Sequence, residues 1–516
     1  MGINSSKRVH TSSEHGPSQY PTPASTQVSS PTIPSFLHLD QREINSKFDL
    51  LNDAQLDRHA SYAKNPVPTH PYAIVGTEES RNRDRYIDVH PWANSRFRLN
   101  VAEGRSDYIN ASLVSTEMPW LHKKFSKKYI VSQGPRPVDI PYFWTMMWDA
   151  IPQQVLSTSS AYSGVGKQSS RSRSGHEQST IIMVTKTHEG LSEKCAPYWE
   201  DVHGNTPLTV LPRLIGSPLG PLVVKTENFI SQAENVFAQE LPSEETKHSQ
   251  AIGCDVRQIV LTETPNLAVL PAWMPLINKS AEQPSSKYIT HYNFTAWPDH
   301  DSPSGLARGQ LLKLIEETRK KPEPIVVHCS AGVGRSGTFI ALEALLAALE
   351  SGDLLKEWYA RTGGLRSRGR SATPDSPSHS RRAATSSDLS YSSPRNARGT
   401  TQLEGRDRIF SSPVVMTDHH GDLMSADGRS PSSLSPPSPA AVGTYAISDG
   451  GLPTAKQWDP VYELVDRLRE QRMWMVQSVA QLAFVYQVLR EKWIERYCCG
   501  EEGRARFDDD LERKHS

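Results

Sequence analysis

The chain of 516 residues carries 57 lysines and arginines against 57 aspartates and glutamates, which gives a formal net charge of zero. This balance excludes an overall electrostatic attraction to nucleic acid or to an anionic membrane, so any charged site must be local. Five cysteines without metal-ligand spacing, and the lack of a signal peptide or a long apolar run, predict a reduced, soluble, intracellular protein.

Residues 1–35 are dominated by polar residues and proline, a composition that predicts a disordered N-terminal tail. Gly2 and Ser6 within it fit the N-myristoylation pattern, although a chance match explains them equally well, and a single acyl chain anchors a protein only weakly. Low-complexity stretches at about 157–179 and 363–451 interrupt foldable sequence. We interpret them as insertions into one domain over residues 36–497, which a charged tail over 498–516 follows.

The remaining sequence alternates between strand-like and helix-like patterns. Short runs rich in β-branched residues predict strands at 180–185, 258–262, 288–294 and 324–328. Apolar residues at helical spacing predict helices at 338–349 and 476–493. This alternation favours a layered α/β or α+β domain.

One segment carries a distinctive chemistry: His328-Cys-Ser-Ala-Gly-Val-Gly-Arg335-Ser336 follows a predicted strand and precedes a predicted helix. Its glycines allow backbone N–H groups to turn toward one point, and the helix N-terminus adds positive potential there. Such a nest favours the thiolate of Cys329, a ready nucleophile, while the planar fork of Arg335 can bind two oxygens of a phosphoryl group. An inert buried cysteine and a nucleotide-binding loop are weaker alternatives, and the Gly-Lys-Ser/Thr ending of the latter is absent.

This loop resembles the signature of the classical, cysteine-dependent protein tyrosine phosphatases, in which His-Cys precedes five residues, Arg, and Ser or Thr. Six further motifs resemble those of the family, in family order. They are Asp107-Tyr-Ile-Asn-Ala-Ser112, Tyr129-Ile-Val-Ser-Gln-Gly-Pro135, Phe143-Trp-Thr-Met-Met-Trp148, Lys194-Cys-Ala-Pro-Tyr-Trp199, Trp297-Pro-Asp299 and Met475-Val-Gln-Ser-Val-Ala-Gln481. The resemblance spans most of the foldable chain, and it implies a central mixed, twisted β-sheet flanked by α-helices, with long disordered insertions.

The resemblance also implies catalytic roles. Asp299 would be the general acid on a loop that closes over the substrate, and would then act as base toward water. Gln477 would position that water, with Gln481 supporting it. Ser336 would assist departure of the cysteine from a phosphocysteinyl intermediate, and His328 would orient the nucleophile. A turn cap at Asp299 and a polar helix face at the two glutamines are the plainer alternatives.

Substrate-binding residues follow from the same resemblance. Asp84-Arg-Tyr86-Ile-Asp88 is similar to the phosphotyrosine-recognition loop, in which Tyr86 would pack on the substrate ring and Asp88 would hold the peptide backbone. Lys194 belongs to another family motif and is a further candidate. The phosphate cradle would consist of Ser330, Ala331, Gly332, Val333 and Gly334.

Three positions depart from the family pattern. Asp301 stands where the family often places glycine, which would alter the closing loop. Ile87 stands where some members carry a basic side chain, so a preference for acidic peptides does not carry over. Trp474 lies three residues before Gln477, where its ring would narrow the cleft.

The sequence therefore predicts hydrolysis of phosphotyrosine in proteins, protein kinases among them, without a metal or organic cofactor. A dual-specificity phosphatase and a phosphotyrosine-binding pseudophosphatase are the alternatives; the loop around Tyr86 argues against the first and the complete catalytic set against the second. No nucleic-acid partner is expected. The expected location is the cytoplasm, with the nucleus as an alternative, and membrane contact would require acylation of Gly2.

Overall fold

The computed structural model of the chain describes residues 33–151, 178–199, 209–211, 219–232, 244–263, 286–298, 301–362 and 458–512. The predicted insertion at 363–451 and nearly all of the predicted tail and of the insertion at 157–179 lie outside these residues. Gly2, Ser6 and Asp299 also lie outside them.

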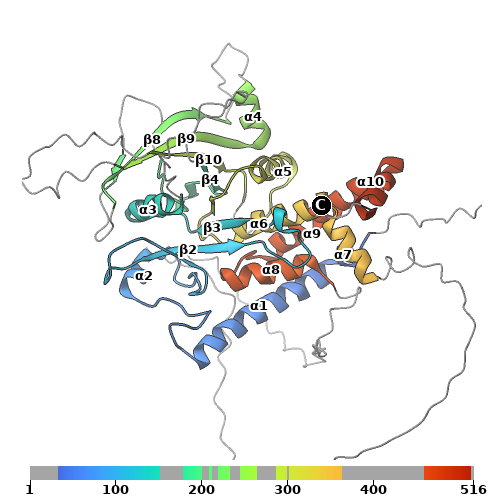
Figure 1. Cartoon of the computed structure of the whole chain (residues 1–516), viewed down its shortest axis with the longest axis horizontal. Helices are drawn as coiled ribbons and strands as arrows, with labels where there is room; N and C mark the ends of the chain where they lie inside the picture. Colours follow the sequence, from blue (N-terminus) through green and yellow to red (C-terminus); the bar gives the residue numbers. More distant parts are fainter. Residues whose placement is uncertain are drawn as a thin grey trace, which may run out of the picture.

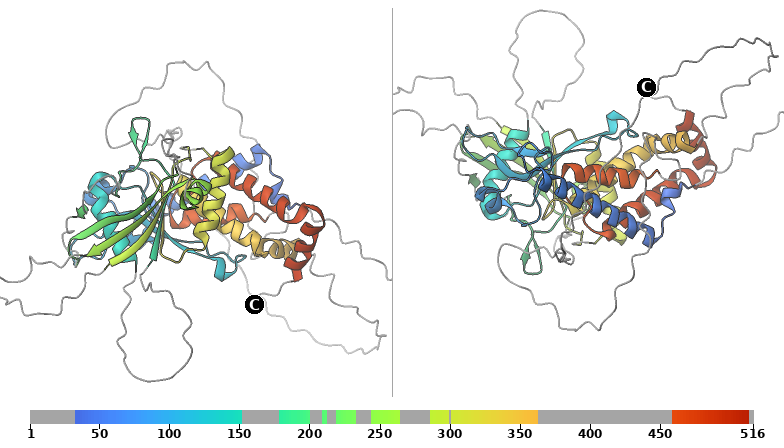
Figure 2. Two further views of the ribbon diagram at one scale, coloured as in Figure 1. Left: turned by 90° about the horizontal axis from the view of Figure 1, so that it is seen from above. Right: turned by 90° about the horizontal axis from the view of Figure 1, so that it is seen from below.

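A mixed, twisted sheet occupies the centre of the described part of the chain, and its strands fan out in Figure 2. The nine strands described lie in the order β1-β2-β3-β11-β4-β10-β9-β8-β7 (Figure 1). Neighbours from β3 through β11 and β4 to β10 are parallel, and the other pairs are antiparallel. Their bounds are β1 Arg96–Arg98, β2 Tyr108–Ser115, β3 Lys128–Ser132, β4 Gln178–Met183, β7 Thr209–Leu211, β8 Leu222–Ile230, β9 Cys254–Glu263, β10 Ser286–Phe294 and β11 Ile325–His328.

Helices cover both faces of this sheet, which confirms the predicted α/β class (Figure 1). The core on one face is shared by α1 and by α4 to α10, and the core on the other face by α3. The helix bounds are α1 Gln41–Lys64, α2 Glu78–Arg83, α3 Ile140–Ala150, α4 Glu244–Ile252, α5 Gly305–Arg319, α6 Gly334–Glu350, α7 Asp353–Thr362, α8 Pro460–Gln471, α9 Val479–Trp493 and α10 Gly500–Glu512. Single turns are η1 Ser35–Leu37, η2 Lys123–Phe125, η3 Pro137–Asp139 and η6 Ile494–Cys498, and β5 His188–Glu189 pairs with β6 Ser192–Glu193 in a separate hairpin. Among the helices described, none is long and apolar enough to span a membrane.

The central strand β11 contributes side chains to the hydrophobic core on each face of the sheet. All four of its residues are buried, and three of them are β-branched. Ile325 and Val327 pack into the core shared by α6 and α9, whereas Val326 points to the core under α3. Because both faces are covered, this strand is continuously apolar up to His328, where the chain leaves the sheet.

Helix α6 follows β11 after a short loop and is buried along its whole length except at Glu350. A helix that is apolar on every side belongs inside a domain. It begins at Gly334, four residues earlier than predicted. The apolar pattern did not reveal this first turn because the polar residues Arg335 and Ser336 occupy it.

The C-terminal helices also differ from their predicted bounds. Helix α9 begins at Val479, since Val476 has a left-handed φ of 57° and cannot be helical. Gln477 therefore precedes the helix and is not on its polar face. Residues assigned to a charged C-terminal tail form α10, whose Phe507 is buried against Tyr497.

A close approach of backbone to backbone joins α6 to the segment before α9. A Cβ added at Gly337 would lie 2.6 Å from the backbone nitrogen of Val476 and 3.1 Å from Cα of Met475. Only glycine leaves room for this contact, so the position tolerates no side chain without a shift of one segment.

We expect Gly337→Ala to lower the free energy of unfolding by about 1–3 kcal/mol, because the added methyl group overpacks this contact. The matched control is Gly309→Ala on the exposed side of α5, where nothing lies within 4 Å of the added Cβ. Alanine favours helix over glycine, so the control should gain about 0.5–1 kcal/mol. Urea unfolding of both variants measures the difference, and a stabilised Gly337→Ala variant would contradict the close approach.

Candidate active site

The loop between β11 and α6 places Cys329 at the edge of the sheet where the parallel strands end. Residues 329–334 are all buried, and the backbone N–H of Gly332 donates a hydrogen bond to Cys329 Sγ at 3.2 Å. Gly332 has a φ of 70°, and a Cβ there would lie 2.1 Å from the carbonyl oxygen of Ser132. Glycine is therefore required, and the loop aims an amide at the sulfur.

The carbonyl groups of the same loop face a different partner, Arg472 at the end of α8. Its Nε donates to the carbonyl of Gly332 at 2.8 Å and its Nη2 to that of Ala331 at 3.0 Å. Burial lowers the pKa of Arg472 to about 10, so the guanidinium stays charged at neutral pH. Because a buried cation holds the carbonyls outward, the loop amides are left to face the nucleophile.

Arg335 reaches from the first turn of α6 to two other segments. Its Nη1 donates to Glu189 Oε1 at 2.6 Å and to the backbone carbonyl of Trp297 at 3.2 Å. The side chain is almost wholly buried, whereas Glu189 keeps part of its surface in solvent. Glu189 thus fixes the guanidinium of Arg335 at the end of the 329–334 loop. Arg335 in turn holds the segment around Trp297, which precedes Asp299 in the chain.

His328 lies on the far side of the loop, in a buried chain of polar groups. Its Nδ1 lies 3.2 Å from the carbonyl oxygen of Cys329, and its Nε2 lies 2.6 Å from the Tyr198 hydroxyl. Burial lowers the pKa of His328 to about 4, so the ring is neutral at neutral pH. Since the carbonyl can only accept, Nδ1 carries the proton, and Tyr198 donates to Nε2.

Residues 84–88, which we call the recognition loop, contact residues 329–334, which we call the nucleophile loop, through Tyr86. Its hydroxyl lies 2.8 Å from Ser330 Oγ, and its ring packs in a small cluster with Ala331, Val333 and the half-buried Trp474. Two residues on, burial raises the pKa of Asp88, and its buried Oδ1 has no hydrogen-bond partner among the described residues. Tyr86 therefore packs against the loop that carries Cys329, and Asp88 keeps a buried acceptor atom without a partner among the described residues.

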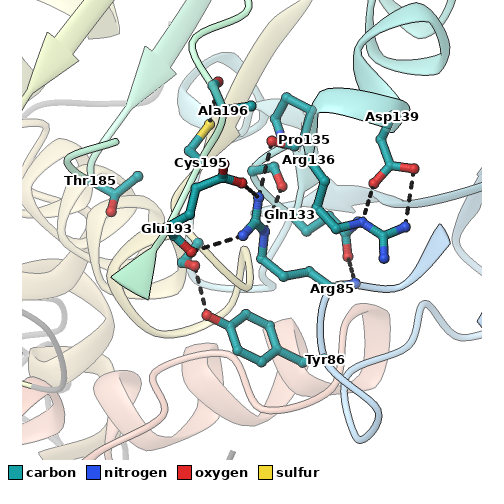
Figure 3. Close-up of polar contacts among 12 residues, drawn as sticks. Arg85, Tyr86, Gln133, Pro135, Arg136, Asp139, Thr185, Glu193, Cys195 and Ala196 are labelled. Carbon is teal, nitrogen blue, oxygen red and sulfur yellow. Dashed lines mark hydrogen bonds and ion pairs between the residues drawn. The ribbon is translucent and has the colours of Figure 1, made fainter. Parts of the chain in front are cut away.

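Arg85 ties this loop to its neighbours, as Figure 3 shows. Its Nε donates to the carbonyl of Gly134 at 3.0 Å and its Nη2 to that of Pro135 at 3.1 Å. Its Nη1 donates to the carbonyl of Glu193 at 2.9 Å, and Nη2 meets the carboxylate of the same residue at 3.2 Å. The recognition loop and the β5–β6 hairpin are therefore bonded together.

Gln477 and Gln481 lie next to the first turn of α6. The side-chain oxygen of Gln481 accepts from the backbone N–H of Gln477 at 2.9 Å and takes part in the N-terminal capping box of α9. A Cβ at Gly334 would meet Gln481 Nε2 at 2.9 Å and Gln477 Oε1 at 3.2 Å. Both glutamines thus flank the loop, and the missing side chain of Gly334 makes room for them.

The other predicted residues take these positions. Ser336 is fully buried, and its hydroxyl has no hydrogen-bond partner in the described ranges. Lys194 follows β6 and is half-buried, with its backbone N–H bonded to Thr187. Asp299 lies outside the described residues, although Trp297 just before it is buried and donates from Nε1 to the carbonyl of Asp301 at 3.0 Å.

The sequence analysis assigned no role to three residues that hold the site together, Arg85, Glu189 and Arg472. Arg472 and Arg85 act through backbone carbonyls, which leave no pattern in a sequence, and Glu189 sits in a hairpin with ordinary turn composition. The one available signal was indirect: Arg85 and Arg472 adjoin motifs that the sequence analysis had already selected.

The assembled groups suit attack on a phosphoryl group. Cys329 Sγ accepts from a loop amide, the guanidinium of Arg335 is held by Glu189 at the end of the same loop, and the ring of Tyr86 packs against that loop. Within the described ranges, no cluster of three or more His, Cys, Asp and Glu side chains is arranged to hold a metal ion.

A protein family and several known proteins are similar to this chain. The family model of protein-tyrosine phosphatase matches residues 80–164 and 221–362. Tyrosine-protein phosphatase non-receptor type 2 of Rattus norvegicus is 29% identical over 294 residues, which cover 56% of this chain and 52% of that protein. Receptor-type tyrosine-protein phosphatase C of Homo sapiens is 29% identical over 278 residues, which cover 53% of this chain and 15% of that protein.

A solved structure described as PTPN18 in complex with HER2-pY1196 phosphor-peptides has a TM-score of 0.44 and 16% identity, covering 87% of this chain and 92% of that one. The match to the non-receptor relative extends over about half of that protein's length. The matched family model contains the nucleophile loop and the recognition loop described above. Over residues 80–164 and 221–362, the chain is similar to the protein-tyrosine phosphatase family.

Proposed function

We propose that this protein hydrolyses phosphotyrosine in proteins through a phosphocysteinyl intermediate. The observation that carries the proposal is the nucleophile loop itself. Cys329 Sγ accepts from the amide of Gly332, and Arg335 is held beside the loop by Glu189 at 2.6 Å. A thiolate in a nest of amides beside a guanidinium is arranged to attack a phosphate dianion and to stabilise the charge that develops on its oxygens.

In the first step the Cys329 thiolate attacks phosphorus, a sulfur–phosphorus bond forms, and the bond from phosphorus to the tyrosyl oxygen breaks. The leaving oxygen takes a proton from Asp299, the general acid in this proposal. The hydrogen bond from Arg335 to the Trp297 carbonyl supports this role, because it ties the neighbouring segment to the phosphate-binding side chain. Loop amides and Arg335 bind the three equatorial oxygens.

In the second step water attacks the phosphocysteine, and the sulfur–phosphorus bond breaks. Asp299, now a carboxylate, accepts a proton from the water, inorganic phosphate leaves, and the thiolate returns. Gln477 positions the water, and Gln481 holds Gln477 through its backbone N–H at 2.9 Å. The unpartnered hydroxyl of Ser336 is the group we assign to stabilising the departing sulfur.

Phosphotyrosine-containing proteins, protein kinases among them, are the proposed substrates, and the cytoplasm is the proposed location. The aromatic wall at Tyr86 supports selectivity for tyrosine, since a phosphoserine side chain is too short to use it. Asp88 is placed to accept a hydrogen bond from the substrate backbone.

The deciding experiment follows phosphate release from matched phosphotyrosyl and phosphoseryl peptides with reductant and without added metal. We expect the wild type to act on phosphotyrosine alone. Cys329→Ser removes the nucleophile and should reduce release to background, and Asp299→Ala should slow it about 10²- to 10⁴-fold through loss of the general acid. Equal release from phosphoserine would favour a dual-specificity phosphatase. Binding without any release would favour a pseudophosphatase.

Gln477→Ala should slow hydrolysis of the intermediate more than its formation, because the water loses its orientation. We expect a rapid burst of phenol from an aryl phosphate, then steady turnover about 10- to 100-fold slower than in wild type. Rapid mixing measures both phases. The control is Gln487→Ala, an exposed glutamine on α9, which should show wild-type kinetics. Loss of the burst itself would place Gln477 in the first step instead.

Hydrogen peroxide should inactivate the enzyme, and a thiol should restore it, because a thiolate is oxidised first. Two other cysteines are protected, since burial raises the pKa of Cys195 and of Cys254 well above the usual value for cysteine. Mass spectrometry after brief treatment should find sulfenic acid at Cys329, with inorganic phosphate slowing its formation. Oxidation confined to other cysteines, with activity lost, would contradict this expectation.

A further inference from the structure

Two segments contact the nucleophile loop or its arginine and are joined to each other. The first is the recognition loop, residues 84–88, and the second is the β5–β6 hairpin, residues 188–193; we call the pair the docking rim. Arg85 crosses between them and bonds the carbonyl and carboxylate of Glu193 (Figure 3). Each segment also reaches the reactive groups directly, since Tyr86 bonds Ser330 and Glu189 bonds Arg335.

Each segment of the docking rim presents one large apolar side chain to solvent. Ile87 is 64% exposed and Leu191 is 96% exposed. A single exposed apolar residue is ordinary, but here both lie within two residues of a side chain that contacts the nucleophile loop or its arginine. Leucine at this place in the hairpin contributes nothing to packing, so folding does not account for it.

The hairpin turn leaves the identity of residue 191 free. Glu189 pairs with Ser192, so Gly190 and Leu191 form a two-residue turn, and Gly190 takes the left-handed conformation with a φ of 61°. Turn positions of this kind usually carry small polar residues. A leucine there, on a hairpin held by the bonds of Arg85 and Arg335, is suited to contact a ligand bound beside the nucleophile loop.

The charges of the docking rim give no support to an acidic ligand. The docking rim carries the carboxylates of Asp84, Asp88, Glu189 and Glu193 against one cation, Arg85, and Lys186 and Lys194 on either side of the hairpin bring the cations only to three. Arg85 is already paired with Glu193. Acidic residues beside a phosphotyrosine would therefore meet no excess of positive charge, whereas apolar residues would meet Ile87 and Leu191.

We propose that the docking rim selects phosphotyrosyl segments whose neighbouring residues are apolar, with Ile87 and Leu191 as the side chains that contact them. This inference rests on the proposed phosphatase function and names the substrate class of that same site. The half-buried ring of Trp474, which packs in the cluster of Tyr86, continues the apolar lining on the inner side. Contact with the peptide removes apolar surface of Ile87 and Leu191 from water, and this burial is the source of the selectivity.

The test compares two phosphotyrosyl peptides of equal length in a glycine–serine background, one with leucines and one with glutamates on both sides of the phosphotyrosine. For the full-length wild type we expect kcat/KM to be about tenfold higher for the leucine peptide, the scale of one well-buried aliphatic contact. Ile87→Arg and Leu191→Arg should each lower this ratio about five- to tenfold, since arginine removes the contact and attracts glutamate. Raising the salt concentration should leave the wild-type ratio unchanged and weaken the variants' gain for glutamate.

The matched control is Leu113→Arg on β2, a leucine that is 52% exposed and does not belong to the docking rim. It should retain the wild-type ratio. A wild-type ratio near one, a preference for glutamate, or equal shifts in all three variants would overturn the proposal. Ratios within one enzyme cancel general losses of activity, so poor folding of a variant does not imitate the effect.

A binding measurement separates this inference from the proposed hydrolysis. Cys329→Ser cannot turn over substrate, and fluorescence anisotropy of labelled peptides should show about tenfold tighter binding of the leucine peptide. Tight, selective binding with no turnover by the wild type would refute hydrolysis and support the docking rim. Equal turnover of both peptides would support hydrolysis and refute the docking rim, and neither binding nor turnover would refute both.

Discussion

The burial of Arg472 is the interaction on which the site depends. A guanidinium removed from water costs several kcal/mol unless its donors are satisfied, and here four acceptors surround it. Two are the carbonyls of Ala331 and Gly332, and two are side chains of β2, Asn110 Oδ1 at 2.8 Å and Ser112 Oγ at 3.1 Å. The nucleophile loop cannot turn its carbonyls inward without leaving this cation unpaired. Its amides are therefore available to an anion before any anion arrives.

The same helix fixes the segment before Gln477, the residue proposed to position water. Arg469, one turn before Arg472 on α8, donates to the carbonyls of Met475 at 2.9 Å and Val476 at 2.9 Å. These bonds hold a stretch in which both Trp474 and Val476 have left-handed φ angles, a conformation that side chains resist. The loop that carries Cys329 and the segment before Gln477 are thus held by arginines of one short helix, which lies more than a hundred residues after the nucleophile loop in the chain.

The sequence predicted the strands and helices that short-range residue patterns determine, and it missed the contacts between residues that are distant in the chain. The apolar run of β11 and the helix formers of α6 indicated their structures, and Cys329 and Arg335 were identified by spacing. The start of α9 was wrong because bonds from Arg469 hold Val476 in a left-handed conformation, and no local pattern reports them. Glu189 was missed for a similar reason: its partner Arg335 is far away in sequence and meets it only in the fold.

Arg85 repeats the principle seen in α8, since it too binds backbone carbonyls, those of Gly134, Pro135 and Glu193. Every residue type has a backbone carbonyl, so these bonds determine the path of each loop but do not require particular side chains at the accepting residues. Lysine could not replace the arginine, because a single ammonium lacks the planar fork that spans two segments. Residues on the outside of the same loops, such as Ile87 and Leu191, can therefore change while the scaffold stays in place. The bonds that hold the loops of the candidate site are thus separate from the exposed side chains of the docking rim, which explains why the candidate catalytic residues can be recognised from spacing while the proposed substrate preference cannot.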